Sequence, residues 1–330
     1  MKVLVAGGAG YIGSHAVYEL IRAGHEAVVF DNLSTGRRDA VHPCARFFEG
    51  DIRDKQALSA CIQTEVKTTG APFDVAMHFA AKLIVPESVT QPLAYYENNV
   101  EGLRTMLEAL VDNGVRNIVF SSTAAVYGEP TGAACSEDDY TVPINPYGET
   151  KLADERMIKW VCAAHDMNYC ILRYFNVAGA DASLEIGLDK DQLTHLIPLI
   201  MQTALGLREK LSIFGDDYDT PDGTCIRDYI HVTDLAKAHI LGAQYLVDNK
   251  ASLLVNLGSG KGFSVTEVVN AAKELFDFSY EYTTRRPGDP AKLTADISRA
   301  RALLGWEPEL DLRSMLESDY AYRKKISPAR

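Results

Sequence analysis

Three glycines near the N-terminus, at positions 7, 10 and 13, constrain the fold of this chain more than any other feature. They stand between Lys2–Ala6, an apolar run typical of a strand buried on both faces, and a helical pattern over residues 11–23. Gly7 permits a tight turn, Gly10 leaves no side chain to collide with a phosphate, and Gly13 lets the helix pack closely on the strand. Because the free N–H groups of the helix start face the same point, the segment predicts a pyrophosphate-binding turn.

The following residues repeat this alternation of strand and helix. Strand-like runs lie at 27–30, 46–49, 75–79, 117–121 and 170–174, and helical patterns lie near 54–67, 92–112 and 147–165. Strands that alternate with helices of this length indicate βαβ units with right-handed crossovers. We therefore predict an α/β fold built on a Rossmann-type doubly wound parallel sheet.

The alternation changes after about Gly179, which indicates a second part of the chain. A helical pattern near 192–205 and a loop-rich acidic stretch follow, whereas the segment near 226–250 is regular enough to return to the first part. We expect a dinucleotide-binding domain over residues 1–179 with that return segment, and a smaller C-terminal α/β domain over residues 180–330.

An acidic residue, Asp31, follows the second predicted strand, 18 residues after Gly13. A carboxylate at this place binds both hydroxyls of a ribose and repels a 2′-phosphate, which favours NAD over NADP. Arg37 and Arg38 argue for the phosphate, but charges six and seven residues further on are more often solvated loop residues. The predicted cofactor is therefore NAD.

Side chains that follow the next two strands extend this predicted site. Asp51 is placed to bond the amino group of adenine and Ile52 to cover its face, although the acid could instead cap the next helix. The fourth strand ends in Phe79, Ala80 and Ala81, whose small side chains leave room for a cofactor at the carboxyl edge of the sheet. Asn98 is expected on the ribose side.

A tyrosine and a lysine carry the predicted chemistry. Tyr147 and Lys151 stand four residues apart on a predicted helix, so both side chains project from one face. A tyrosine becomes a base at neutral pH if its pKa falls by about 3 units, or about 4 kcal/mol, which a neighbouring ammonium and a cationic nicotinamide can supply. The end of the fifth strand, Ser121 to Thr123, supplies hydroxyls for the substrate oxygen, and we choose Thr123 for that role.

Together these residues resemble the extended short-chain dehydrogenase/reductase family, over essentially the whole chain. The segments that carry the resemblance are 7–15, 31–33, 78–81, 87–89, 95–100, 121–128, 145–151, 173–179, 213–218, 222–232 and 286–289. Residues 227–232 in particular look like the nucleotide-sugar epimerases of that family.

The resemblance implies an activity on UDP-hexoses. Tyr147 would remove the proton of the sugar 4-hydroxyl while hydride passes from C4 to NAD, with Lys151 lowering the tyrosine pKa and Thr123 bridging the 4-oxygen. Return of the hydride to the other face would interconvert UDP-galactose and UDP-glucose. The residues implied to contact NAD are Gly7, Gly10, Tyr11, Ile12, Gly13, Asp31, Asn32, Asp51, Ile52, Phe79, Ala80, Ala81, Asn98, Ser121, Tyr147, Lys151, Tyr174 and Phe175.

The resemblance also makes the second domain the binder of the UDP-sugar. Asn176 would hold the diphosphate, with Arg227 and Arg286 neutralising it. Phe214 resembles a uracil contact and Asp289 a ribose contact. The implied substrate set is Thr123, Tyr147, Asn176, His195, Leu196, Phe214, Arg227, Arg286, Asp289 and Leu293, and no metal is implied.

Three positions depart from the pattern of the family. Lys82 stands one place before the position, Leu83, where relatives often carry a lysine, which puts a direct lysine contact to the cofactor in doubt. His195 stands where an asparagine can bind the diphosphate. Leu293 replaces a tyrosine, and we hypothesise that the smaller side chain also admits UDP-N-acetylhexosamines.

Other functions remain as alternatives. A nucleotide-sugar 4,6-dehydratase or decarboxylase shares the oxidation at C4, but a dehydratase needs acids beside the catalytic threonine, where this chain has Ala124 and Ala125. A non-catalytic NAD-sensing binder would have lost the tyrosine. The resemblance further implies a homodimer, packed through the helices over 92–112 and 147–165.

Composition sets limits on partners and location. Subtracting 45 acidic from 33 basic residues leaves a net charge of −12, which argues against nucleic acid or anionic membrane as a partner. No apolar run approaches the roughly 18 residues that span a bilayer, and the N-terminus lacks a signal-peptide pattern. With six scattered cysteines, expected to be reduced packing residues, we expect a cytoplasmic protein.

Overall fold

The chain divides into two compact units in a computed structural model, which describes residues 1–130, 132–189, 193–285 and 290–327. Unit 1 comprises Met1–Val126, Thr141–Arg173 and Ala236–Val255, and unit 2 comprises Tyr127–Tyr140, Tyr174–Leu235 and Asn256–Arg330. Compared with the expected boundaries, residues 127–140, 174–179 and 226–235 group with unit 2. In the first of these segments the N–H of Cys135 donates to the carbonyl of Thr294.

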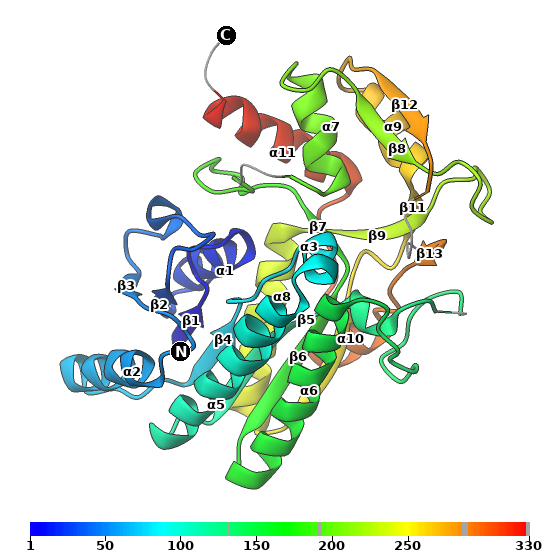
Figure 1. Ribbon diagram of the computed structural model, residues 1–330. Coiled ribbons are helices and arrows are strands. Elements are labelled where there is room, and N and C mark those ends of the chain that lie inside the picture. The colour runs from blue at the N-terminus through cyan, green and yellow to red at the C-terminus, as the bar shows by residue number, and fades with distance from the viewer. Residues whose placement is uncertain (131, 190–192, 286–289, 328–330) are drawn as a thin grey trace. The chain divides into compact units, whose positions relative to one another are not determined.

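Unit 1 is built on a parallel sheet whose strand order reverses in the middle (Figure 1). The order is β10-β6-β5-β4-β1-β2-β3. The strands are β1 (Lys2–Ala6), β2 (Glu26–Asp31), β3 (Arg46–Glu49), β4 (Val75–His78), β5 (Asn117–Thr123), β6 (Asn168–Tyr174) and β10 (Leu253–Leu257). All five residues of β1 are buried, as expected of a central strand covered on both faces.

Right-handed crossovers place the helices of unit 1 on both faces of the sheet. The chain leaves β1 in one direction and β4 in the other, so α1 (Tyr11–Arg22) covers the face opposite to α5 (Gly102–Asp112) and α6 (Pro146–His165). Figure 1 shows α5 and α6 lying along one face, where they share a core with α2 (Lys55–Thr69). The helix α8 (Val232–Asn249) begins in unit 2 and packs on the other face, with Gly242 against the side chain of Cys170.

The helical pattern over 92–112 is not one regular helix. It comprises α4 (Pro92–Tyr95), a π-helical segment η2 (Tyr96–Glu101) and α5. A π turn holds one more residue than an α turn, and such turns are frequent at functional sites. At the start of α5, a Cβ on Gly102 would lie 2.7 Å from Cδ1 of Ile52, so glycine lets the helix pass this close without moving that side chain.

Unit 2 contains a four-stranded sheet and a strand pair. The sheet holds β7 (Asn176–Ala178), β9 (Ile226–His231), β11 (Gly262–Ser264) and β13 (Lys292–Leu293), and β8 (Leu211–Phe214) pairs with β12 (Tyr280–Thr283). The helices are α7 (Leu196–Ala204), α9 (Val265–Lys273), α10 (Ser298–Leu304) and α11 (Leu312–Ile326). The helix expected near 192–205 thus starts at Leu196, and residues 190–192 lie outside the described residues. Short segments are η1 (Arg38–Ala40), α3 (Val85–Thr90) and η3 (Ala124–Tyr127).

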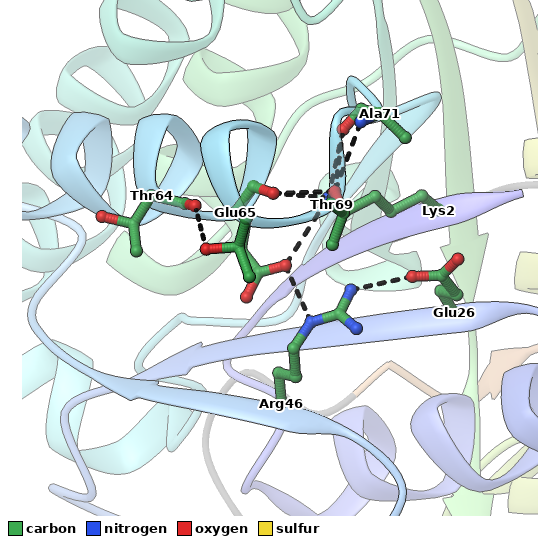
Figure 2. Close-up of polar contacts among 8 residues, drawn as sticks. Lys2, Glu26, Arg46, Thr64, Glu65, Thr69 and Ala71 are labelled. Carbon is green, nitrogen blue, oxygen red and sulfur yellow. Dashed lines mark hydrogen bonds and ion pairs between the residues drawn. The ribbon is translucent and has the colours of Figure 1, made fainter.

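A buried ion pair fastens α2 to the edge of the unit 1 sheet (Figure 2). The ammonium of Lys2 lies 3.5 Å from a carboxylate oxygen of Glu65, and both side chains are less than 5% exposed. It also donates to the Thr69 hydroxyl at 2.6 Å and to the Ala71 carbonyl at 3.1 Å. Nε of Arg46 lies 2.7 Å from the same carboxylate of Glu65, so one acid joins β1, β3 and α2.

Replacing Glu65 with alanine is expected to destabilise the protein by about 3–5 kcal/mol, because it leaves the ammonium of Lys2 buried without an anion. Chemical denaturation measures this loss. The matched control is Glu26→Ala, which removes the exposed partner of Arg46 and should cost no more than about 1 kcal/mol. Equal losses in the two variants would contradict the role given to burial.

Candidate active site

The glycine turn after β1 lies directly against the residues that follow β4. Gly7 has φ +82°, and a Cβ there would lie 2.6 Å from the Ala80 nitrogen and 2.7 Å from the Phe79 carbonyl carbon. A Cβ on Gly13 would lie 2.1 Å from the Gly7 oxygen, whereas one on Gly10 would meet that oxygen at 3.4 Å, an ordinary contact. The turn therefore sits where the strand order reverses, which is where open α/β sheets bind ligands.

Asp31, the last residue of β2, lies against the same turn. Its buried carboxylate accepts hydrogen bonds from the N–H of Ala9 at 2.9 Å and from that of Leu33 at 2.8 Å. The acid expected to bind a ribose is thus held in place by the backbone of the turn. Arg37 forms an exposed pair with Asp39, as expected of a solvated loop charge.

Asp51 is placed next to Asn32 and does not cap the following helix. The side chain of Asp54 accepts the N–H bonds at the start of α2, which removes the alternative reading of Asp51. Asp51 instead accepts from Asn32 at 2.9 Å and pairs with Arg53 at 2.8 Å. Bonding to Arg53 holds the pKa of Asp51 far below its usual range, so this carboxylate stays ionised. Ile52 is buried in the core shared by α2 and α5.

Tyr147 and Lys151 are brought to the carboxyl end of β5 by the start of α6. Asn145 caps that helix through the N–H of Gly148. A Cβ on Gly148 would lie 2.7 Å from the carbonyl oxygen of Ala125, so glycine permits the close approach of α6 to the segment after β5. The side chain of Tyr147 lies within interaction distance of Thr123, the last residue of β5, and the catalytic role of this threonine stays a prediction.

In the chain alone, burial shifts both members of this pair toward their neutral forms. Burial raises the pKa of Tyr147 to about 12, and the hydrogen bond from Thr123 opposes this only in part. The amine of Lys151 donates to the carbonyl of Ser121 at 2.9 Å and lies 4.5 Å from the ring centre of Phe120. The expected lowering of the tyrosine pKa by Lys151 is therefore not a property of the chain alone. Burial also lowers the pKa of Lys151.

Two supporting interactions behind the pair escaped the sequence analysis. Glu155 forms a buried pair with Arg173 at 2.6 Å and accepts the hydroxyl of Ser122 at 2.5 Å, which joins α6 to the ends of β5 and β6. Its spacing, four residues after Lys151, was the available signal. On the other face, the Ser121 hydroxyl lies 3.1 Å from Nε2 of His239 in α8. No local pattern connects residues that far apart in the sequence.

Asn99 is a further buried side chain that the sequence analysis did not select. Its amide accepts from the N–H of Lys82 at 2.9 Å and donates to the Lys82 carbonyl at 3.1 Å and the Thr150 hydroxyl at 3.1 Å. The predicted contact Asn98 precedes it in η2 and donates to its side-chain oxygen. The π-helical segment thus holds the loop after β4 beside the start of α6.

The substrate residues expected in unit 2 fall partly on one sheet. Leu293 in β13 pairs in register with Arg227 in β9, and Asn176 in β7 pairs with Tyr229 in β9. Arg227 is nearly buried, and its Nη1 donates to the Ile226 carbonyl at 2.9 Å.

The other expected residues of unit 2 lie at the ends of elements. His195 immediately precedes α7, Leu196 begins it and Phe214 ends β8. Tyr174 ends β6, and Phe175 follows it. Two expected substrate contacts, Arg286 and Asp289, lie outside the described residues.

The described parts of the chain contain neither a membrane-spanning helix nor a cluster of metal-binding side chains. No helix there is long and apolar enough to cross a membrane. No group of three or more His, Cys, Asp or Glu in those parts is arranged to hold a metal ion. All six cysteines are free thiols, and Cys44 alone among them is exposed.

The doubly wound sheet, the glycine turn at its switch point and the buried tyrosine and lysine beside it are the features of a dinucleotide-binding enzyme. The model of the NAD dependent epimerase/dehydratase family matches residues 3–258. The chain belongs to this family.

The relatives of the chain are similar over nearly their full length. A UDP-glucose 4-epimerase of Halalkalibacterium halodurans is 48% identical over 328 residues, which are 98% of this chain and 96% of the relative. The crystal structure of a UDP-glucose-4-epimerase from Stenotrophomonas maltophila, with bound NAD and formylated UDP-arabinopyranose, superposes with a TM-score of 0.94 at 39% identity, covering 99% of this chain and 98% of that one. A UDP-Glc/GlcNAc 4-epimerase of Campylobacter jejuni has a TM-score of 0.85 at 43% identity, covering 98% and 99%.

Two glycine variants separate cofactor binding from folding. Gly10→Ala should leave the unfolding free energy within about 1 kcal/mol, because its Cβ meets an ordinary contact, but it should weaken NAD binding at least about tenfold by blocking the phosphate. Gly13→Ala should lose stability as well, because its Cβ collides with the Gly7 carbonyl. Calorimetric NAD titration and urea unfolding of both variants measure these effects. Undiminished NAD binding by Gly10→Ala would contradict the phosphate site.

Proposed function

We propose that this protein interconverts UDP-galactose and UDP-glucose by epimerisation at C4 of the sugar, with NAD as its cofactor. The observation that carries the proposal is the buried trio of Tyr147, Lys151 and Thr123 at the carboxyl end of β5. It lies in the same unit as the glycine turn and Asp31. The relatives described above are named as 4-epimerases of UDP-sugars, at up to 48% identity over nearly the whole chain.

Tyr147 is the group that accepts the proton of the sugar 4-hydroxyl and returns it. Thr123, already hydrogen-bonded to Tyr147, is placed to bond the same sugar oxygen and so aligns the two hydroxyls. With a pKa of about 12, ionising Tyr147 at pH 7 costs about 7 kcal/mol, which a cation beside the phenol must offset. Bound NAD supplies the acceptor for the hydride of C4 and a positive nicotinamide ring.

Lys151 is the cation that the chain itself contributes. Its amine donates to the carbonyl of Ser121, which lies two residues before Thr123 at the end of β5. We assign it the nicotinamide ribose and the phenolate as partners. The remaining NAD contacts are those of the glycine turn, Asp31 and the Asp51–Ile52 pair.

The uridine diphosphate is assigned to residues of unit 2. Arg227 and Arg286 neutralise the diphosphate and Asn176 and His195 donate hydrogen bonds to it. Phe214, which is 36% exposed, offers its ring to the uracil, and Asp289 is assigned to the ribose, with Leu196 at the start of α7 completing the set. Support comes from the shared sheet of Asn176 and Arg227.

The alternative functions are less well supported. A dehydratase requires acidic groups beside Thr123, and Ala124 and Ala125, at the start of η3, occupy those places. A decarboxylase shares the oxidation step but finds no additional support in the described residues. A non-catalytic binder would not require Tyr147 beside Thr123, and both residues are present.

The direct test mixes the purified protein with UDP-galactose without added NAD. An epimerase forms UDP-glucose, a binder forms nothing, and a net dehydrogenase stalls with reduced cofactor. Tyr147→Phe should lower turnover by at least about 1,000-fold while NAD binding persists, because the proton acceptor is lost. Tyr140→Phe, at a residue that is 94% exposed, is the matched control and should keep the wild-type rate. Near-normal turnover by Tyr147→Phe would reject the assigned base.

UDP-N-acetylhexosamines are proposed as further substrates because Leu293 is smaller than the tyrosine that relatives can carry at this position. It lies in β13 beside Arg227, the residue assigned to the diphosphate. Leu293→Tyr should lower kcat/KM for UDP-N-acetylgalactosamine about tenfold or more relative to UDP-galactose, since the larger ring fills the space around the 2-substituent. Wild-type activity on the acetylated sugar at background level would dispose of the proposal.

We also infer a homodimer in a reducing, cytoplasmic setting. Large apolar side chains are exposed on α3, α4, η2 and α6, which pack on one another: Val89, Leu93, Tyr96 and Trp160 are 60%, 82%, 44% and 79% exposed. Exposed apolar patches of this kind mark association surfaces. Light scattering measures the association directly.

A further inference from the structure

A second buried acid lies next to the catalytic pair, and the mechanism above does not use it. Asp154 stands on α6 three residues after Lys151 and seven after Tyr147, so helical periodicity places the three on one face. Its side chain is 0% exposed. Neither carboxyl oxygen has a hydrogen-bond partner among the residues that the structure describes. A buried carboxyl without partners is costly, so its presence needs a cause.

We propose that Asp154 is the buried counter-ion of Lys151, a positioning residue that keeps the proton on the amine beside the catalytic tyrosine. For catalysis this inference rests on the proposed function, whereas the charge pairing does not. An amine without a proton can still accept a hydrogen bond, but it offers no positive charge to a phenolate. Loss of that proton would therefore remove the cation that the chain contributes.

The contacts of Lys151 show why a counter-ion is required. The amine is 2% exposed, and its contacts with described residues are the neutral carbonyl of Ser121 and the ring of Phe120. Burial of an ammonium among neutral groups favours the unprotonated amine. A neighbouring carboxylate opposes this, and the charge of Asp154 raises the pKa of Lys151 more than any other group does.

The other buried acid of α6 is already committed elsewhere. Glu155 accepts two hydrogen bonds from Arg173, at 2.9 and 2.6 Å, and one from Ser122. Its charge is thus balanced by a guanidinium on the neighbouring strand. Asp154 is therefore the acid on this face of α6 that is available to pair with Lys151.

The elements packed against α6 bring no competing buried charge to Asp154. His78 on β4 pairs in register with Phe120, and burial together with Lys151 lowers its pKa to about 3, so it is neutral. The charged groups on α3, η2 and α5 are paired with one another or with their own neighbours toward solvent: Lys82 with Glu87, Arg53 with Glu97, and Arg104 with Glu101 and Glu108. Tyr95 on α4 bonds Glu87.

The acid acts mainly on the lysine. Asp154 is one helical turn from Lys151 but two turns from Tyr147, whose pKa its charge also raises. Burial raises the pKa of Asp154 itself, and Lys151 opposes that rise. Each member of the pair therefore stabilises the charged form of the other.

The first test is the pH profile of kcat/KM for UDP-galactose. Asp154→Asn keeps the shape of the side chain and removes its charge, so the alkaline fall of the profile, where Lys151 loses its proton, should move at least about one unit toward lower pH. Asp154→Glu restores the charge and should move the fall back. Glu149→Gln removes the same charge from an exposed position of the same helix and should leave the profile in place. An unshifted fall in Asp154→Asn would overturn the proposal.

The second test does not depend on activity. The folded-state pKa of Asp154 is raised, so the stability that Asp154 contributes is lost as pH rises above its unfolded pKa of about 3.9. The folded-state pKa of Lys151 is lowered, so the stability that Lys151 contributes is lost as pH falls below its unfolded pKa of about 10.4. Asp154→Asn abolishes the loss of stability that comes from Asp154 and enlarges the loss that comes from Lys151. Relative to wild type, the stability of Asp154→Asn in urea should therefore increase with pH. A difference that stays constant with pH would mean a purely structural role and refute the pairing.

A double variant covers the case in which Asp154→Asn does not fold. Lys151→Met leaves Asp154 buried without its cation, so adding Asp154→Asn should raise the stability of that variant. If the addition lowers stability instead, the two charges are not paired. Wild-type protein inactive on UDP-sugars would refute the proposed function, while the two stability measurements would still decide the pairing.

Discussion

The site depends on one close contact between backbones. The turn after β1 packs against the residues after β4 with no room for a side chain between them. Gly7 touches the backbone at Ala80, and Gly13 touches the carbonyl of Gly7, at distances that no Cβ could occupy. The reversal of strand order at this point requires two adjacent strands to send their chains to opposite faces of the sheet. The glycines let the two departing chains lie this close together.

Tyr147 and Lys151 show how burial in the folded chain changes the protonation of ionisable side chains. Burial moves the pKa of Tyr147 upward and that of Lys151 downward, so both groups are pushed toward their neutral forms. On the same helix, Arg173 balances the charge of the buried Glu155, whereas the buried carboxyl of Asp154 has no hydrogen-bond partner among the described residues.

Much of the fold was predictable because its signals are local. The periodicity around β1, β2 and β3 and the glycines that end helices mark the elements of unit 1 to within a few residues, and Tyr147, Lys151 and Thr123 lie together as their spacing predicts. The supporting contacts were not predictable in the same way. Ser121 and His239, or Asn99 and Thr150, meet only because the sheet brings distant segments together. The raised pKa of Tyr147 was not predictable for a similar reason, since burial is a property of the folded chain.

The π-helical turn before α5 has a consequence for how this chain can vary in length. Asn99, in the π-helical segment, bonds Lys82 and Thr150. Gly102, three residues further on, packs closely against Ile52. Each residue advances an α-helix by about 100°, so deleting or inserting one residue between these two points would rotate either the amide or the glycine away from its partner. The stretch is therefore locked in register at both ends, and substitutions are tolerable there where changes of length are not.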